Sequence, residues 1–181
     1  MTLTRRCLLG GLAGAGALVK AAPVVVDLVA ARTWLSIGGR SVELISYSGQ
    51  APGPVIDLRP GQELTIRLRN QLPEPTNLHF HGLHVPPNPG VDDSFLKIAP
   101  GAQHEYRFTL PTNHPAGTFW YHPHVYGHTA DQVSGGLAGA IIVRSQLEDA
   151  MDVGRIPEQV MVLQDFDVAS NDALARPSGM E

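Results

Sequence analysis

The sequence is poor in three features, and each shortage excludes a class of protein. A single cysteine, Cys7, among 181 residues excludes an internal disulfide and a cysteine-based zinc site. The formal net charge is −4, and no run of Lys or Arg follows residue 20, so nucleic acid is not an expected partner. Since no apolar stretch reaches the roughly 20 residues that a membrane span needs, we expect no such span.

Turn formers and short alternating segments are abundant instead. The chain contains 19 glycines and 15 prolines, and 43% of its residues are hydrophobic. Apolar and polar residues alternate in Glu63–Arg69 and Glu105–Leu110, as in strands with one face in a core, and Gly139–Val143 is typical of a fully buried strand. The pattern predicts an all-β fold, an antiparallel β-sandwich. Turn signals separate the segments, among them Gly38-Gly39, Pro60-Gly61 and Pro100-Gly101.

Residues 1–22 have the features of an export signal. Arg5-Arg6 precedes a glycine-rich apolar stretch from Cys7 to Val19, and small residues follow at Ala21-Ala22. Paired arginines before a mildly apolar core favour the twin-arginine route, which predicts a periplasmic or secreted protein. The alternative is a disordered or short helical N-terminus. Cleavage near Ala21 would leave a mature chain without cysteine.

The regular alternation begins near Thr33, so we expect one β-domain over residues 33–146. The sequence then turns polar, like a linker, before Gln159–Leu163 starts another strand. No core-forming pattern follows that strand. Residues 147–181 are therefore predicted to be a linker and the first strand of a truncated second domain. Helical hints are brief, at 130–133 and 146–151.

The eight histidines are the most unusual part of the composition. Four of them form two His-x-His pairs, His79-Phe80-His81 and His122-Pro123-His124. Alternate residues of a strand project from one face about 6–7 Å apart, so each pair can direct two imidazoles to one metal ion or bridge two ions. Neutral imidazole binds copper, zinc, iron and nickel, so histidine alone does not name the metal. Two surface or hydrogen-bonded pairs that bind no metal are the alternative.

The segments that carry these pairs resemble the first cupredoxin domain of multicopper oxidases, the laccase-like enzymes, especially their bacterial members. The resemblance rests on Glu74–His84, His114–His124 and Gln132–Gly139, and it extends from about Thr33 to Val143. It implies a cupredoxin-like Greek-key β-sandwich and a copper enzyme. Tyr126 departs from the bacterial pattern, which often has histidine there, at a position that is not a ligand in the family.

The resemblance also implies a mechanism and a role for each histidine. In the family, one type-2 copper and a type-3 pair lie between the first and last domains, are held by eight histidines and reduce dioxygen to water. Carried over by position, His79 would bind the type-2 copper, His81 and His122 would share one type-3 copper, and His124 would bind the other. Missing C-terminal cupredoxin domains or another chain would supply the rest of the site. The reducing substrate stays unknown.

Other candidate residues lie close to the two pairs. Family members use an acidic residue near the three coppers to relay protons, and the matching region here contains Asp92-Asp93 where the family usually has Asp-Gly. Either aspartate could take this role, and two solvated surface carboxylates are the alternative. Trp120 and Tyr121 are expected to pack beside the metal strand. Surface or hydrogen-bonded positions are expected for the remaining histidines, His84, His104, His114 and His128.

The chain lacks the cysteine thiolate of a type-1 copper and the later histidine strings that would complete the three-copper site, so it is not expected to act alone as a laccase. Three hypotheses follow. The chain is the N-terminal domain of an exported multicopper oxidase, a stand-alone periplasmic copper-binding or copper-delivery module, or a metal-free cupredoxin domain that only assembles with partners.

Overall fold

The structure, a computed structural model, describes residues 21–145, 148, 151 and 156–169. Most of the predicted export signal, including Cys7, lies outside these residues. The elements in chain order are β1 (Val24–Ile37), β2 (Arg40–Tyr47), β3 (Ile56–Leu58), β4 (Glu63–Asn70), β5 (His79–His81), β6 (Gln103–Thr109), β7 (Gly117–His122), α1 (Thr129–Ser134) and β8 (Gly139–Val143).

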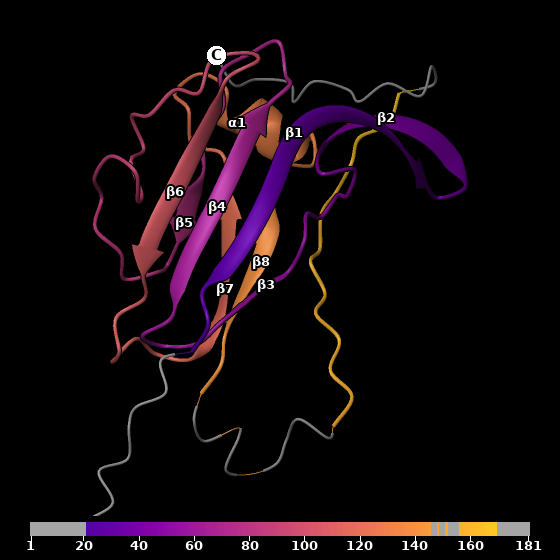
Figure 1. Cartoon of the computed structure of the whole chain (residues 1–181). Coiled ribbons are helices and arrows are strands. Elements are labelled where there is room, and N and C mark those ends of the chain that lie inside the picture. Colours follow the sequence, from indigo (N-terminus) through magenta and orange to yellow (C-terminus); the bar gives the residue numbers. More distant parts are fainter. Residues whose placement is uncertain (1–20, 146–147, 149–150, 152–155, 170–181) are drawn as a thin grey trace, which may run out of the picture.

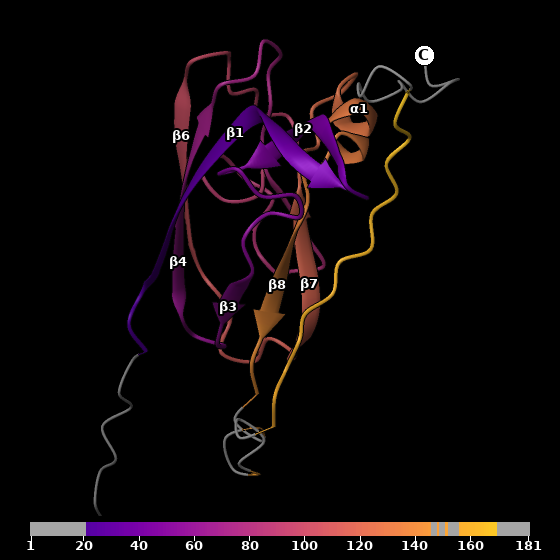
Figure 2. The same ribbon diagram turned by 90° about the vertical axis from the view of Figure 1, so that its right-hand side faces the viewer.

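The strands form two four-stranded sheets, with orders β2-β1-β4-β6 and β3-β8-β7-β5, which lie face to face (Figures 1 and 2). This arrangement confirms the predicted all-β, cupredoxin-like sandwich. Four of the strand pairings are antiparallel, as predicted, whereas β1 with β4 and β3 with β8 are parallel. Parallel neighbours need a long connection, and the chain supplies one by passing through the opposite sheet between them.

The alternating segments bury one face between the sheets, as predicted. On β4 the side chains of Leu64, Ile66 and Leu68 are fully buried. On β6 the buried residues are Tyr106 and Phe108, while their neighbours along the strand are exposed. Every residue of β8 is buried, which confirms the expectation of a fully buried strand. The sheet that carries β5 and β7 is therefore held rigidly against a packed core.

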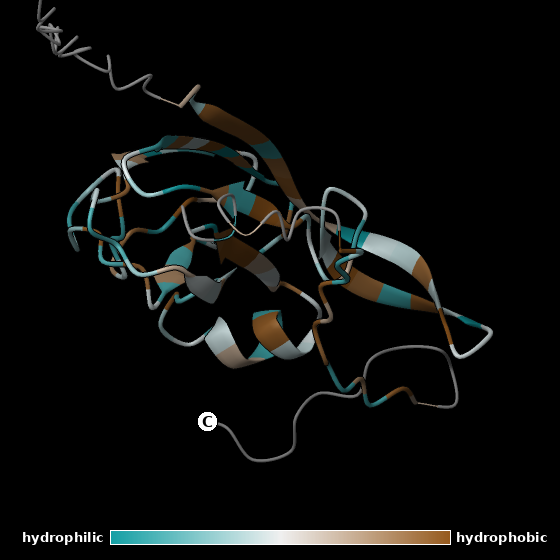
Figure 3. Cartoon of the chain, turned by 90° about the horizontal axis from the view of Figure 1, so that it is seen from below, coloured by the Kyte–Doolittle hydropathy of each residue, from teal (hydrophilic) through white to brown (hydrophobic). Residues whose placement is uncertain are grey.

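Strand β1 begins well before Thr33, where alternation first becomes visible in the sequence. Its first half pairs with β4, and its second half pairs with β2. Val24–Val26 are all apolar, so the alternation of apolar and polar residues that would reveal a strand is missing there. The second half and β2 form a hairpin around Gly38-Gly39, whose positive φ angles of 57° and 82° suit a two-residue turn. Figure 3 shows this hairpin extending from the sandwich.

The ring of Tyr121 fills a slot between β7 and β8. Its hydroxyl donates a hydrogen bond to the carbonyl of Pro54 at 2.8 Å. A Cβ atom added at Gly139 would overlap Cζ of Tyr121, far inside van der Waals contact. The absence of a side chain at Gly139 therefore lets the residue next to His122 pack flat against β8.

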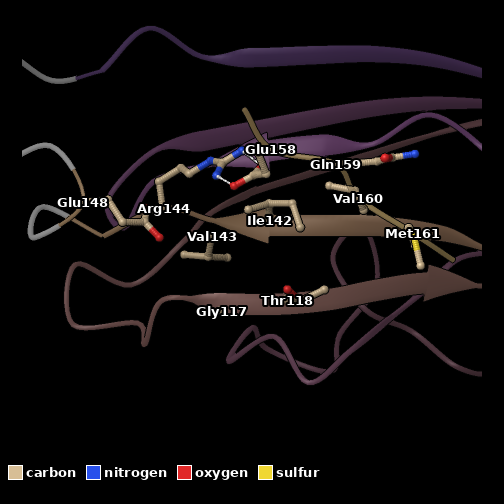
Figure 4. Close-up of a pocket in the computed structure, with 10 residues that line it drawn as sticks. All are labelled: Gly117, Thr118, Ile142, Val143, Arg144, Glu148, Glu158, Gln159, Val160 and Met161. Atoms are coloured by element: carbon tan, nitrogen blue, oxygen red, sulfur yellow. Dashed lines mark hydrogen bonds and ion pairs between the residues drawn. The ribbon is translucent and has the colours of Figure 1, made fainter. Parts of the chain in front are cut away.

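The predicted strand at Gln159–Leu163 is extended in the structure but pairs with no strand. Val160 and Met161 line, together with Ile142 of β8, a groove of about 300 Å³ (Figure 4). Arg144 links the segment to β3, because its guanidinium donates to Glu158 at 2.7 Å and to Asp57 of β3 at 2.6 Å. Side-chain contacts rather than a ladder therefore hold this segment.

Helical structure is brief, as expected. The hint at 130–133 corresponds to α1, and the hint at 146–151 falls mostly outside the described residues. Among the helices that the structure describes, none has the length and apolar character needed to cross a membrane.

Candidate metal centre

The pairing of β5 with β7 brings the two His-x-His motifs together. The register sets His79 opposite His122 and His81 opposite Trp120. One ligand atom from each of His79, His81 and His122 lies within 4.8 Å of the other two. The ring centroid of His124 is 5.2 Å from that of His79 and 6.1 Å from that of His122. The four histidines singled out in the sequence thus lie at one locus.

His81 and His122 face each other with nitrogen atoms at the spacing of a shared metal ion. Nδ1 of His81 lies 3.4 Å from Nε2 of His122. Nδ1 of His122 donates to the carbonyl of Pro123 at 2.9 Å, which leaves the Nε2 lone pair of the neutral ring directed at His81. Two metal–nitrogen bonds of about 2.0 Å that diverge by roughly 110–120° place their nitrogens about 3.3–3.5 Å apart. The donor set therefore fits one ion between these rings.

The environment of His122 keeps its imidazole neutral. Burial lowers the pKa of His122 to about 4, the bond to Pro123 acts in the opposite direction, and His79, His81 and His124 lower it further by charge repulsion. At neutral pH the ring is therefore in the unprotonated form that coordinates metals.

A buried carboxylate orients His79. Nδ1 of His79 donates to Oδ1 of Asp92 at 2.9 Å, and the backbone N–H of Phe80 donates to the same oxygen at 3.1 Å. This bond leaves Nε2 of His79 free to bind a metal, as in the carboxylate–histidine pairs of many metal sites. Asp93 instead accepts from the N–H of Phe95 at 2.9 Å within its own turn. Of the two aspartates left undecided by the sequence, Asp92 is the one in contact with a candidate ligand.

Trp120 packs directly against the candidate ligands. Its ring is stacked on His122, with centroids 4.0 Å apart and planes at 25°, and on His81, with centroids 5.1 Å apart and planes at 24°. Packing of Trp120 beside the metal strand was expected from the sequence, but its stacking on the two imidazoles was not. The signal available in the sequence was the two-residue spacing of Trp120 and His122, which places both rings on one face of a strand.

The remaining histidines take hydrogen-bonded or ring-packing positions. His114 is buried, its Nε2 accepts from the N–H of His84 at 3.0 Å, and its Nδ1 donates to the carbonyl of Pro115 at 2.8 Å. His104 packs on Tyr106 of β6, with centroids 4.7 Å apart. His128 precedes α1 as its N-cap residue. The cluster of ligand atoms described above contains none of these four side chains.

Comparison with known proteins gives a consistent result. The family model described as "Multicopper oxidase" matches residues 29–148. Copper resistance protein A of Escherichia coli is 33% identical over 144 residues, which cover 77% of this chain and 22% of that protein. Copper resistance protein A of Pseudomonas syringae pv. tomato is 30% identical over 186 residues, covering 90% of this chain and 29% of the relative.

Solved structures agree with these sequence relatives. A multicopper oxidase from Campylobacter jejuni, called a metallo-oxidase, superposes with a TM-score of 0.61 at 33% identity, over 71% of this chain and 29% of that one. A laccase from Pediococcus acidilactici superposes with a TM-score of 0.71 at 25% identity, over 84% of this chain and 36% of that one. The chain spans less than a third of the length of these curated relatives.

Proposed function

The chain belongs to the multicopper oxidase family, and we propose that it acts as the N-terminal copper-binding domain of such an oxidase. In this role it supplies half of the eight histidines that hold a three-copper site. The observation that carries the proposal is the meeting of two His-x-His motifs, from β5 and the end of β7, at one locus.

The residues present fit copper. Imidazole nitrogens are suitable copper ligands, and the 3.4 Å spacing between His81 Nδ1 and His122 Nε2 suits one ion. His79 would hold the type-2 ion through Nε2, and His124 would hold the second type-3 ion. When bound, the copper ions would supply the redox chemistry that reduces dioxygen to water while a substrate is oxidised.

Asp92 has two roles in this proposal. It holds the ring of His79 in one orientation, and as a buried carboxylate beside the site it can accept and release a proton. Asp93 lies in the same loop, but its side chain closes a local turn instead. We assign the acidic role expected from the family resemblance to Asp92.

We also propose export by the twin-arginine route and completion of the site by further cupredoxin domains or another chain. Arg5-Arg6 and the glycine-rich stretch after them support export. The small share of each relative that this chain covers supports a larger assembly. Dioxygen and an organic or metal-ion reductant would be the substrates of that assembly.

Copper titration of the full chain tests whether the cluster binds metal. The wild-type chain is expected to bind Cu²⁺ stoichiometrically, and His122→Ala is expected to weaken binding by at least about tenfold. His114→Ala is the matched control, because His114 is as buried as His122 but lies outside the cluster. It is expected to keep the copper affinity of the wild type. Absence of stoichiometric binding by the wild type would leave only a structural domain, and equal losses in both variants would place the metal elsewhere.

A second measurement separates an oxidase domain from a stand-alone copper module. The native protein is purified from its source, and its mass and its sequence beyond Glu181 are determined. A longer chain with a later His-Cys-His string supports the oxidase. A native protein that ends at Glu181, stays monomeric and binds copper would favour the stand-alone module.

A further inference from the structure

The strand that carries the second histidine pair ends inside that pair. The β5–β7 register sets His79 opposite His122, and continuing it by two residues sets Asn77 opposite His124. β7 ends at His122, directly before Pro123. His124 therefore lies beyond the strand and needs a different anchor.

The side chain of Asn77 provides that anchor. Its Oδ1 accepts the backbone N–H of His124 at 2.6 Å. Its Nδ2 donates to the carbonyl of Leu96 at 3.0 Å and lies 3.5 Å from the carbonyl of Ser94. Asn77 is fully buried, so water does not compete for these bonds. One amide group thus joins His124 to the loop that contains Asp92.

The backbone on both sides of Asn77 is itself fixed. Thr76 exchanges two backbone hydrogen bonds with Ile98, at 3.1 and 2.9 Å, and its hydroxyl bonds to Gln132 of α1 at 2.8 Å. The N–H of Leu78 donates to the hydroxyl of Tyr106 at 2.8 Å. A short, rigidly held side chain is therefore in place to position the residue opposite it.

We infer that Asn77 is a positioning residue for the fourth histidine ligand. Its side-chain Oδ1 takes the N–H of His124, which a continued ladder would pair with main chain, and so sets the place of the His124 ring beside His79. The inference rests on the proposed function, since it concerns a ligand of that same site. The contacts with His124, Leu96 and Ser94 need a side chain of this length that carries an acceptor and a donor side by side, as an asparagine amide does.

Two variants separate the halves of this role. Asn77→Ala removes both the acceptor for His124 and the donor to the loop. Asn77→Asp keeps an acceptor of the same shape for His124 but replaces the donor with a second oxygen that faces the carbonyls of Ser94 and Leu96. The matched control is Asn70→Ala. Asn70 is also fully buried, donates to the carbonyls of Glu74 and Ile98, and accepts from the N–H of Leu72, with no hydrogen bond to a candidate ligand.

The experiment uses the full chain with ¹⁵N-labelled histidine and Zn²⁺ as a diamagnetic probe of the imidazole site. In the wild type, the ring nitrogens of His81, His122 and His124 are expected to shift on adding Zn²⁺. In Asn77→Ala, the His124 shift is expected to be lost while the other two remain, and amide hydrogen exchange at His124 should accelerate by roughly tenfold, as for one lost buried hydrogen bond. Asn77→Asp should recover the His124 shift, and Asn70→Ala should leave it unchanged while lowering the melting temperature.

The outcomes distinguish this inference from the function on which it rests. If His81 and His122 do not respond to Zn²⁺ in the wild type, the proposed metal site itself fails. If they respond and His124 does not, or if His124 responds equally in wild type and Asn77→Ala, then Asn77 positions no ligand. Equal loss in Asn77→Ala and Asn70→Ala would reduce the role of Asn77 to general stability. Amide exchange can be read on the metal-free chain and so checks the hydrogen bond independently of metal binding.

Discussion

Replacing Asp92 with Ala is expected to weaken copper binding, whereas the same change at Asp93 is not. Oδ1 of Asp92 accepts both Nδ1–H of His79 and the N–H of Phe80. Removing a carboxylate that orients a metal-binding histidine costs about 10–100-fold in affinity. The buried N–H of Phe80 is left without a partner, which costs about 1–3 kcal/mol of unfolding free energy. At Asp93 only one bond within a turn is lost, worth about 1 kcal/mol or less.

Competition with a chelator of known affinity measures Cu²⁺ binding, and urea denaturation of the metal-free chain measures stability. Asp92→Asn is the third variant. Its amide oxygen can still accept from Phe80, so stability should recover while the loss of negative charge keeps copper affinity below that of the wild type. A loss of affinity in Asp93→Ala equal to that in Asp92→Ala would refute the assignment. Unchanged affinity in Asp92→Ala would show that His79 needs no support from this loop.

Three further predictions concern the metal and the rings around it. The copper-loaded chain without residues 1–22 should show no intense blue absorption band, because no cysteine thiolate remains to produce one. In the metal-free chain, the pKa of His122 is about 4 in the folded state and returns to its usual 6.5 in the unfolded state, so between these pH values only the unfolded chain takes up the proton. The unfolding free energy should therefore fall by up to about 3 kcal/mol as the pH drops from 6.5 to 4, and His122→Gln should flatten that part of the denaturation curve. In Trp34→Phe only Trp120 remains to fluoresce, and copper should quench most of that emission, whereas Trp120→Phe, with Trp34 on the exposed hairpin, should lose little.

Local periodicity was enough to predict much of the fold, and the His-x-His spacing together with the family resemblance singled out the four candidate ligands. The alternation in Glu63–Arg69 and Glu105–Leu110 specifies which faces are buried, because side-chain direction follows directly from strand geometry. The same period directs His79 and His81 to one face. These features depend on neighbours in sequence, so the sequence alone reveals them.

Features that depend on distant segments could not be found in this way. The choice between Asp92 and Asp93 is made by the loop path, which brings one oxygen to His79 and turns the next side chain toward Phe95. The parallel pairing of β1 with β4 depends on how the chain crosses between sheets. The role of Asn77 depends on the register between β5 and β7, which cannot be predicted from the residues next to Asn77 in the sequence.

The slot that Tyr121 occupies has a consequence for protein engineering. A chimera that imports the histidine-bearing strand from this chain into another cupredoxin host would bring the bulky phenol with it. If the host has a side chain at the position matching Gly139, that side chain would clash with the Tyr121 ring. The backbone of the grafted strand would then be distorted next to its histidine ligands. Strands β7 and β8 are thus a single exchangeable cassette, and shuffling libraries should place their crossover points outside the pair.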